Sequence, residues 1–297
     1  MTIREILEKT YSKYKLSPLD AGILLSLAIK RPREYILAHP EKKLTALQTK
    51  KFLLFAKRRS AGEPVAYITR KKEFFGLEFL VNKNVLIPRP ETEMLIEETL
   101  KKIQDTRYKI PNTIFDVGTG SGNIIISIAK NIPDKIKRKI NFFAIDISKE
   151  SLRVAKANAK RYKLNKKIKF VQSDLLEYFV KRKTKLENIL IIANLPYVSK
   201  NIYKKNKNNL KYEPKNALIS KNKGLDHYLR LFKQTSLLFI VHCSLFIEFS
   251  PEQKPQIGRI IKKYWPKAKI SFFRDLAGKW RVASISLSFF KERVRVR

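Results

Sequence analysis

Residues 113–123, TIFDVGTGSGN, decide the fold of this chain. An apolar stretch reaches Asp116, glycines follow at positions 118, 120 and 122, and an apolar run with helical spacing comes next. Glycines at alternate positions let the backbone turn tightly and approach a ligand that side chains would exclude. The dinucleotide-binding pattern G-x-G-x-x-G is different, because here the third glycine comes one residue earlier. The turn alone does not identify its ligand.

The residues after this turn alternate between strand-like and helix-like patterns. Such alternation predicts a mostly parallel sheet with helices on both faces. Two β-rich stretches near the end, AKISFFRDL and RVASISLSF, predict an antiparallel pair at the sheet edge, joined through Gly278. The predicted strands after the first one are INFFAID at 140–146, KIKFVQ at 167–172 and LENILIIAN at 186–194.

Acidic residues at the ends of the second and third strands indicate a cofactor. Asp146 follows Gly122 by 24 residues, at a place where a carboxylate can accept hydrogen bonds from two ribose hydroxyls. Asp174 and Leu175 follow the next strand and should lie beside the same crevice. The alternative is that Asp146 only caps the helix that begins near Ser148. The glycine turn and the acid together predict a nucleoside-bearing cofactor.

Residues 194–197, NLPY, follow the fourth strand and should lie at the same edge of the sheet. An amide or exocyclic amine nitrogen reacts as a nucleophile where two acceptors orient its lone pair and stabilise the developing charge. The side-chain oxygen of Asn194 and the backbone carbonyl of Leu195 can supply them, since Pro196 keeps Leu195 out of the α region. Tyr197 offers a flat face for a planar group. The alternative is an ordinary strand-to-loop turn, in which Asn and Pro are common.

The amino-terminal 60 residues predict helices. Thr2 with Glu5, and Thr45 with Gln48, fit the capping box, and Pro18 follows a capping Ser17. The next stretch, EFFGLEFLVNKNVLIP at 73–88, alternates enough to predict a hairpin that turns near residues 82–84. The expected domains are a helical recognition domain at 1–72, a β-hairpin connector at 73–92 and a catalytic domain at 93–297.

The composition indicates the cellular compartment in which we expect this protein. A single cysteine, Cys243, excludes a disulfide framework and indicates a reducing compartment. The amino terminus has no apolar signal core, and the longest mostly apolar run, 237–247, is too short to span a bilayer. The histidines show no zinc-ligand spacing. We therefore expect a cytoplasmic monomer without a metal or a membrane partner.

The net charge of +38 is extreme for 297 residues. A positive field of this size attracts phosphate backbones and would indicate a nucleic-acid or ribosome partner. The alternative is compositional, because lysine outnumbers arginine, whereas nucleic-acid readers favour arginine for its bidentate geometry. The lysine-rich residues 200–211 are either a steering surface or a solvated run. We expect at most a weak ribosome or RNA association.

The glycine turn and the two acids resemble the class I S-adenosylmethionine-dependent methyltransferases. The resemblance implies an α/β, Rossmann-like fold with a seven-stranded, mostly parallel sheet, and S-adenosyl-L-methionine as the cofactor. It implies that the turn faces the methionine part, that Asp146 holds the ribose and that Leu175 flanks the adenine. The implied cofactor-binding residues are Asp116, Gly118, Thr119, Gly120, Ser121, Gly122, Asp146, Asp174, Leu175 and Asn194.

Residues outside the NLPY turn indicate which group, a base or a protein amide, accepts the methyl group. NLPY is similar to the N-P-P-Y motif of amino-methyltransferases, and its leucine alone favours the ribosomal-RNA adenine dimethyltransferases, which act on a base. Residues 62–98 instead resemble the segment that joins the two domains of the protein-(glutamine-N5) methyltransferases, with G-x-P-x-x-Y-I, F-x-G-x-x-F and V-L-I-P-R-P-E-T-E all present in essence. Residues 212–218 and 224–226 are similar to a second segment of that family.

This second resemblance implies a protein-glutamine N-methyltransferase that modifies the glutamine of the Gly-Gly-Gln motif in class-one peptide chain release factors and so modulates translation termination. Asn194 and Leu195 would grip the amide, and Tyr197 would pack on it. The implied substrate-binding residues are Arg89, Glu91, Asn194, Leu195, Pro196 and Tyr197, the last four also being catalytic.

Three positions depart from the family pattern. Leu195 replaces a proline, Ser220 and Lys221 replace a glycine pair, and residues 246–253 lack a glycine after the glutamate. The open alternatives are a ribosomal-protein glutamine methyltransferase, a nucleic-acid (rRNA or DNA) adenine N6-methyltransferase, and a non-catalytic RNA- or ribosome-binding protein.

Overall fold

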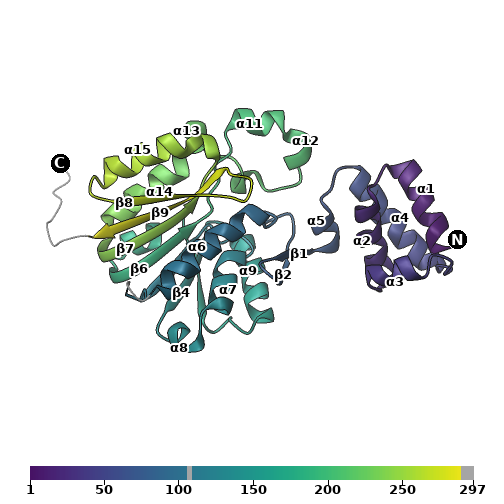
Figure 1. The fold of residues 1–297 in the computed structure, drawn as a ribbon, viewed down its shortest axis with the longest axis horizontal. Coiled ribbons are helices and arrows are strands. Elements are labelled where there is room, and N and C mark those ends of the chain that lie inside the picture. The colour runs from purple at the N-terminus through teal and green to yellow at the C-terminus, as the bar shows by residue number, and fades with distance from the viewer. Residues whose placement is uncertain (106–108, 289–297) are drawn as a thin grey trace.

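The computed structural model describes residues 1–105 and 109–288. The predictions for residues 106–108 and 289–297, including the last residue of the stretch RVASISLSF, lie outside the described residues. Figure 1 shows a group of helices at the amino-terminal end beside a larger part, in which helices cover both faces of one sheet.

The amino-terminal part is helical, as predicted, and its helices begin at the expected caps. Both capping boxes are present, with the side chains of Thr2 and Thr45 accepting from the backbone three residues later. One further short helix, which begins after Pro64, follows the 60 residues for which the sequence predicts helices. The helices are α1 (Ile3–Tyr14), α2 (Pro18–Ile29), α3 (Arg33–Ala38), α4 (Ala46–Ser60) and α5 (Val65–Thr69).

The hairpin lies earlier than the sequence predicted. Strands β1 (Lys71–Phe74) and β2 (Leu77–Leu80) pair antiparallel and turn at Phe75 and Gly76, which both have positive φ. The predicted turn at residues 82–84 is wrong: there the Asn82 side chain accepts from the Asn84 backbone N–H and the chain leaves the sheet. Burial of Phe74 and Phe79 against the larger part decides the register, which an alternating pattern alone does not fix.

The larger part contains one seven-stranded sheet in the order β5-β4-β3-β6-β7-β9-β8. Strands β3 to β7 run parallel, while β9 and β8 are antiparallel at one edge, as predicted. The strands are β3 (Thr113–Val117), β4 (Asn141–Asp146), β5 (Ile168–Gln172), β6 (Lys185–Ala193), β7 (Phe239–Glu248), β8 (Lys269–Arg274) and β9 (Trp280–Ser288).

Helices pack on both faces of this sheet and form two apolar cores. Helices α6, α7 and α9 contribute to one core, and α10, α14 and α15 contribute to the other. The helices of this part are 3₁₀ η1 (Pro90–Thr92), α6 (Glu93–Gln104), α7 (Asn123–Asn131), α8 (Asp134–Lys137), α9 (Lys149–Arg161), α10 (Glu177–Lys181), α11 (Lys200–Lys205), α12 (Lys207–Leu210), η2 (Lys215–Ala217), α13 (Lys221–Gly224), α14 (Asp226–Leu237), η3 (Pro251–Gln253) and α15 (Lys254–Tyr264).

The strand order positions the candidate site. The chain proceeds outward from β3 to β5 on one side and then returns to β6 on the other side of β3. Ligands of open parallel sheets bind at such a reversal, outside the carboxyl ends of the strands. The segments after β3, β4, β5 and β6 all leave the sheet at this edge.

Within the described ranges, no helix is long and apolar enough to cross a membrane.

Candidate active site

The side chain of Asp116 supports the glycine turn that follows β3. Gly118, Gly120 and Gly122 all have positive φ, which explains their pattern. One carboxylate oxygen of Asp116 accepts from the Thr119 hydroxyl at 2.7 Å and from the Ile125 N–H at 3.3 Å, whereas its other oxygen, Oδ1, has no protein partner. Because Asp116 is fully buried, its pKa is raised to about 7. Asp116 therefore supports the turn from behind.

A cavity of about 320 Å³ opens at this edge of the sheet. It brings together residues from the glycine turn, the ends of β4 and β5, and the NLPY turn. Of the predicted site residues, it is lined by Arg89, Gly118, Thr119, Gly120, Ser121, Asp146, Asp174, Leu175, Asn194, Leu195 and Pro196. Asp116, Gly122, Tyr197 and Glu91, all in the described part of the chain, lie outside the lining.

Asp146 lines the cavity and does not cap α9, because Ser148 is the N-cap and its own hydroxyl accepts from the Ser151 N–H at 3.1 Å. Oδ1 accepts from the Ser148 N–H and Oδ2 from the Gly120 N–H, each at 2.9 Å. Each oxygen keeps further acceptor capacity, and the residue also lines the cavity. Burial raises the pKa of Asp146, although its backbone hydrogen bonds oppose the shift. The carboxylate thus fixes the turn and remains able to accept from a diol.

Asp174 and Leu175 form the far end of the cavity. Asp174 makes an ion pair with Arg230 of α14, a cavity-lining residue that the sequence did not indicate. Leu175 is buried and has a φ of 53°, which turns the chain sharply after β5. His227 also lines this end, and burial lowers its pKa, so that its ring stays neutral at pH 7.

These residues fit S-adenosylmethionine. Glycine occurs in the turn at positions where neighbouring side chains lie close to the backbone. A Cβ on Gly118 would lie 3.0 Å from the Leu195 side chain. A Cβ on Gly122 would lie 3.2 Å from that of Ala155. Because β4 lies between β3 and β5, Asp146 at its end lies between the glycine turn and Leu175, which is the order that ribose and adenine require.

The orientation of Asn194 is fixed from behind. Its Nδ2 donates to the Thr92 hydroxyl at 3.0 Å and to Oε2 of Glu248 at 2.9 Å. Both carboxyl oxygens of Glu248 accept hydrogen bonds here, Oε2 from Asn194 and Oε1 from the Tyr197 hydroxyl, so the nitrogen end of the amide faces Glu248. The carbonyl end of Asn194, which lines the cavity, is therefore the end available to a ligand.

Glu248 is the functional residue that the sequence analysis missed. It is only 1% exposed and accepts from Asn194 and, through Oε1, from the Tyr197 hydroxyl at 3.2 Å. Burial raises the pKa of Glu248, and the hydrogen bonds from Thr92 and Tyr197 oppose this shift. Its signal in the sequence is an acid at the end of the apolar strand β7, which pairs directly with β6.

Leu195 is packed against Tyr228. The Tyr228 hydroxyl lies 3.4 Å from both the N–H and the carbonyl oxygen of Leu195, but it donates a much shorter hydrogen bond to the Glu248 carbonyl. A carbonyl oxygen has two lone pairs, so the Leu195 carbonyl keeps acceptor capacity beside the Tyr228 hydroxyl.

Tyr197 is anchored rather than exposed in the cavity. Burial and the neighbouring Glu248 raise the pKa of its phenol, so the hydroxyl keeps its proton and donates to Glu248. Its backbone carbonyl accepts from the Gln253 side chain at 3.1 Å, and that side chain also binds the Lys223 carbonyl. Gly224 lies so close that an added Cβ would be 2.1 Å from the Tyr197 oxygen.

Of the two predicted substrate-binding residues Arg89 and Glu91, only Arg89 lines the cavity. Arg89 lines the cavity and pairs with the buried Glu213, which also accepts from the Ile87 N–H at 3.2 Å. Glu91 is exposed and lies outside the lining.

Among the described residues, no group of three or more His, Cys, Asp and Glu side chains could hold a metal ion.

Family models and relatives agree on the class of protein. Residues 3–69 match a model described as the PrmC N-terminal domain, and residues 111–269 match one described as a methyltransferase domain. The chain is 36% identical to a release factor glutamine methyltransferase of Buchnera aphidicola, over 95% of this chain and 97% of the relative. It is 34% identical to one from Dictyoglomus turgidum, over 95% and 98%.

The fold also occurs in solved structures. A crystal structure of the hMettl16 catalytic domain in complex with MAT2A 3'UTR hairpin 1 superposes with a TM-score of 0.56. That match covers 91% of this chain and 92% of the other at 14% sequence identity, so it concerns the fold alone.

Proposed function

The chain belongs to the release factor glutamine methyltransferases, and we propose from this premise that it methylates the side-chain amide nitrogen of the glutamine in the Gly-Gly-Gln motif of a class-one peptide chain release factor. The methyl donor is S-adenosyl-L-methionine. The observation that carries the proposal is the fixed orientation of Asn194, whose amide nitrogen is held by Glu248 and Thr92.

The residues of the NLPY turn suit a poor nitrogen nucleophile. When bound, S-adenosylmethionine would supply an electrophilic methyl group. The carbonyl of Asn194 and the backbone carbonyl of Leu195 would accept the two N–H bonds of the glutamine amide and orient its lone pair. The same two acceptors would stabilise the positive charge that develops on the nitrogen. The extra proton leaves to water after the transfer.

The two parts of the chain divide the task in this proposal. Residues 1–72 would dock the release factor, residues 73–92 would connect, and residues 93–297 would carry out the transfer. The helical part exposes Leu37, Leu47 and Leu54, each more than half accessible. Arg89 would contact the peptide at the cavity mouth, and Glu91 would influence it only from outside.

The lysine-rich surface adds a weaker proposal. Lysines 200, 204, 205, 207, 211, 215, 221 and 223 lie in one segment, whose single acid, Glu213, is buried and paired with Arg89. A ribosome or RNA association through this segment would be weak and would decline steeply with salt.

We also propose that the chain acts as a monomer.

A labelling experiment tests the function. Labelled S-adenosylmethionine is offered with a release factor, the same release factor with its motif glutamine replaced by alanine, a ribosomal protein and ribosomal RNA. We expect label in the intact release factor alone. Label in the ribosomal protein would assign the close variant of the activity, and label in RNA alone would overturn the proposal. No transfer to any acceptor would favour a non-catalytic binding protein.

A further inference from the structure

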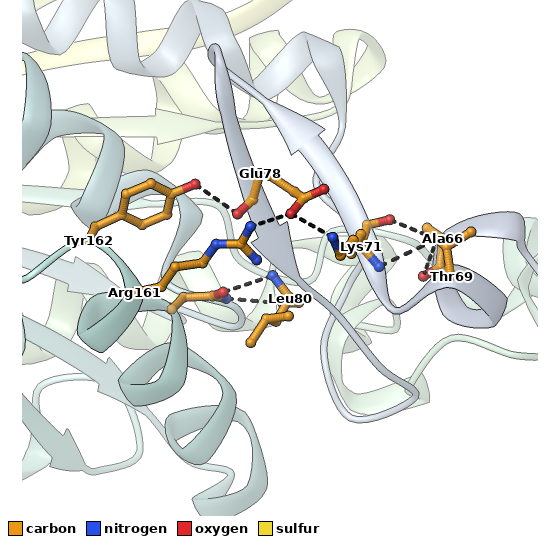
Figure 2. Close-up of polar contacts among 8 residues, drawn as sticks. Ala66, Thr69, Lys71, Glu78, Leu80, Arg161 and Tyr162 are labelled. Atoms are coloured by element: carbon orange, nitrogen blue, oxygen red, sulfur yellow. Dashed lines mark hydrogen bonds and ion pairs between the residues drawn. The ribbon is translucent and has the colours of Figure 1, made fainter. Parts of the chain in front are cut away.

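The connector runs along one face of α9. The Tyr162 hydroxyl donates to the Glu78 carbonyl at 2.8 Å, and Arg161 forms an ion pair with the Glu78 carboxylate (Figure 2). Further along, the Ser151 hydroxyl donates to the Asn84 carbonyl at 3.0 Å. The connector therefore follows α9 from its carboxyl end toward its amino end, and it reaches the cavity at Asn84, Val85 and Leu86.

The contacting residues of α9 and its end form a single stripe. Positions 151, 155, 158 and 162 are separated by four, three and four residues, which places them on one helical face. Ala155 of this stripe lies against Gly122, where an added Cβ would meet its Cβ at 3.2 Å. The same face of α9 thus contacts both the connector and the glycine turn.

Asn158 joins these two contacts in one side chain. Its Oδ1 accepts from the Leu80 N–H at 2.7 Å, and its Nδ2 donates to the Leu80 carbonyl at 3.0 Å. Nδ2 also donates to the Ser121 carbonyl at 2.8 Å. The side chain pairs with Leu80 as a neighbouring strand would, and it is fully buried. These three hydrogen bonds use its acceptor once and both of its N–H donors.

We propose that Asn158 is a positioning residue of the cofactor site, which fixes the glycine turn and the connector in one register. The inference rests on the proposed function only in taking S-adenosylmethionine as the ligand. The position of the turn is then set by three side chains: Asp146, which lines the cavity, and Asp116 and Asn158, which are fully buried and lie outside its lining. The cavity residues Asn84 to Leu86 depend on the same side chain through β2.

The test compares Asn158→Asp with two matched controls. The aspartate keeps the size and the acceptor for the Leu80 N–H, but it places an acceptor against the carbonyls of Leu80 and Ser121. Tyr162→Phe and Arg161→Gln each remove a contact between the same helix and Glu78 without touching the glycine turn. The readouts are the calorimetric Kd for S-adenosylmethionine, the far-UV circular dichroism spectrum and the thermal midpoint without ligand.

We expect Asn158→Asp to raise the Kd for S-adenosylmethionine at least about tenfold at a temperature where its spectrum matches the wild type. Tyr162→Phe and Arg161→Gln should stay within about twofold of the wild type, because exposed ion pairs and single surface contacts contribute little. Asn158→Ser should resemble Asn158→Asp, since a short hydroxyl cannot reach Leu80 and Ser121 together.

An unchanged Kd in the Asn158 variants with a lowered thermal midpoint would overturn the inference, because Asn158 would then serve stability alone. Variants that no longer fold would overturn it for the same reason. A loss of affinity in the control variants equal to that of Asn158→Asp would show that any disturbance of the connector has this effect. If the wild-type protein itself fails to bind S-adenosylmethionine, the failure belongs to the proposed function instead.

Discussion

The side-chain nitrogen of Asn194 lies 2.9 Å from Oε2 of Glu248, and this contact decides which end of the Asn194 amide is presented to the cavity. The two residues are 54 positions apart, at the ends of the adjacent strands β6 and β7. An amide that could rotate freely would offer a donor as often as an acceptor. The buried carboxylate selects the acceptor, which is the group that a glutamine N–H requires.

Glu248→Ala should therefore reduce turnover more than it reduces binding. Without the carboxylate, Asn194 can rotate, and misplacement of a positioning group costs on the order of 100-fold in rate. Steady-state kinetics with a release factor should show a kcat lowered by about this factor and a cofactor KM within a few fold. Glu248→Gln should retain more activity, because its carbonyl can still accept from Asn194. Equal effects on kcat in both variants would contradict this explanation.

Asn194→Ala should abolish detectable transfer and leave cofactor affinity within about tenfold of the wild type, since its principal role is to orient the amide. Calorimetric titration with S-adenosylmethionine and a single-turnover assay measure the two quantities separately. A loss of cofactor binding equal to the loss of rate would assign Asn194 to the cofactor rather than to the glutamine.

Gly224→Ala should destabilise the protein and distort the active-site turn. Gly224 has a φ of +92°, and an added Cβ would lie 2.1 Å from the Tyr197 oxygen and 2.4 Å from Nε2 of Gln253. Strain and overpacking together should lower the free energy of unfolding by about 2–4 kcal/mol. Urea denaturation measures this loss.

Gly278→Ala is the matched control for that prediction. Gly278 has a similar φ of +75°, but nothing lies within 4 Å of an added Cβ. Its cost should be limited to the backbone conformation, about 1 kcal/mol. Equal losses in the two variants would mean that contact with Tyr197 is not the source of the constraint.

Asp116→Asn should change how stability depends on pH. Burial raises the pKa of Asp116 from its ordinary value of 3.8 to about 7, so between these values the folded state holds a proton that the unfolded state has released. This contribution is fully present below about pH 4 and is lost as the pH rises through 7. Asparagine stays neutral and avoids that loss.

The difference in unfolding free energy, variant minus wild type, should thus increase from pH 4 to pH 7 and level off above it. Urea titrations at successive pH values measure this curve. Asp275→Asn provides a control whose difference should stay flat between pH 4 and pH 7, because the Arg281 hydrogen bond lowers the pKa of Asp275 below its ordinary value of 3.8 and its contribution disappears only below that range. A flat difference for Asp116→Asn would contradict the raised pKa.

Local patterns predicted much of the site. The glycine turn, Asp146 and Asn194 each stand directly after an apolar strand, and parallel strands bring such positions to one edge whatever their exact packing. The capping boxes at Thr2 and Thr45 were equally readable, because a cap involves only residues within one helical turn. The connector hairpin was misplaced, since its register depends on where Phe74 and Phe79 are buried.

The sequence by itself thus determined the strand-and-helix order and brought the glycine turn, the acids after β4 and β5 and the NLPY turn to one cavity. Tertiary structure alone decided how those groups are held. Glu248 turns the Asn194 amide, Asn158 joins Ser121 to Leu80, and Glu213 holds Arg89 from 124 residues away. Each is a polar side chain that could have been a surface residue. Its role comes from burial beside a partner distant in the chain, where an unpaired polar group is costly and a paired one has a single orientation.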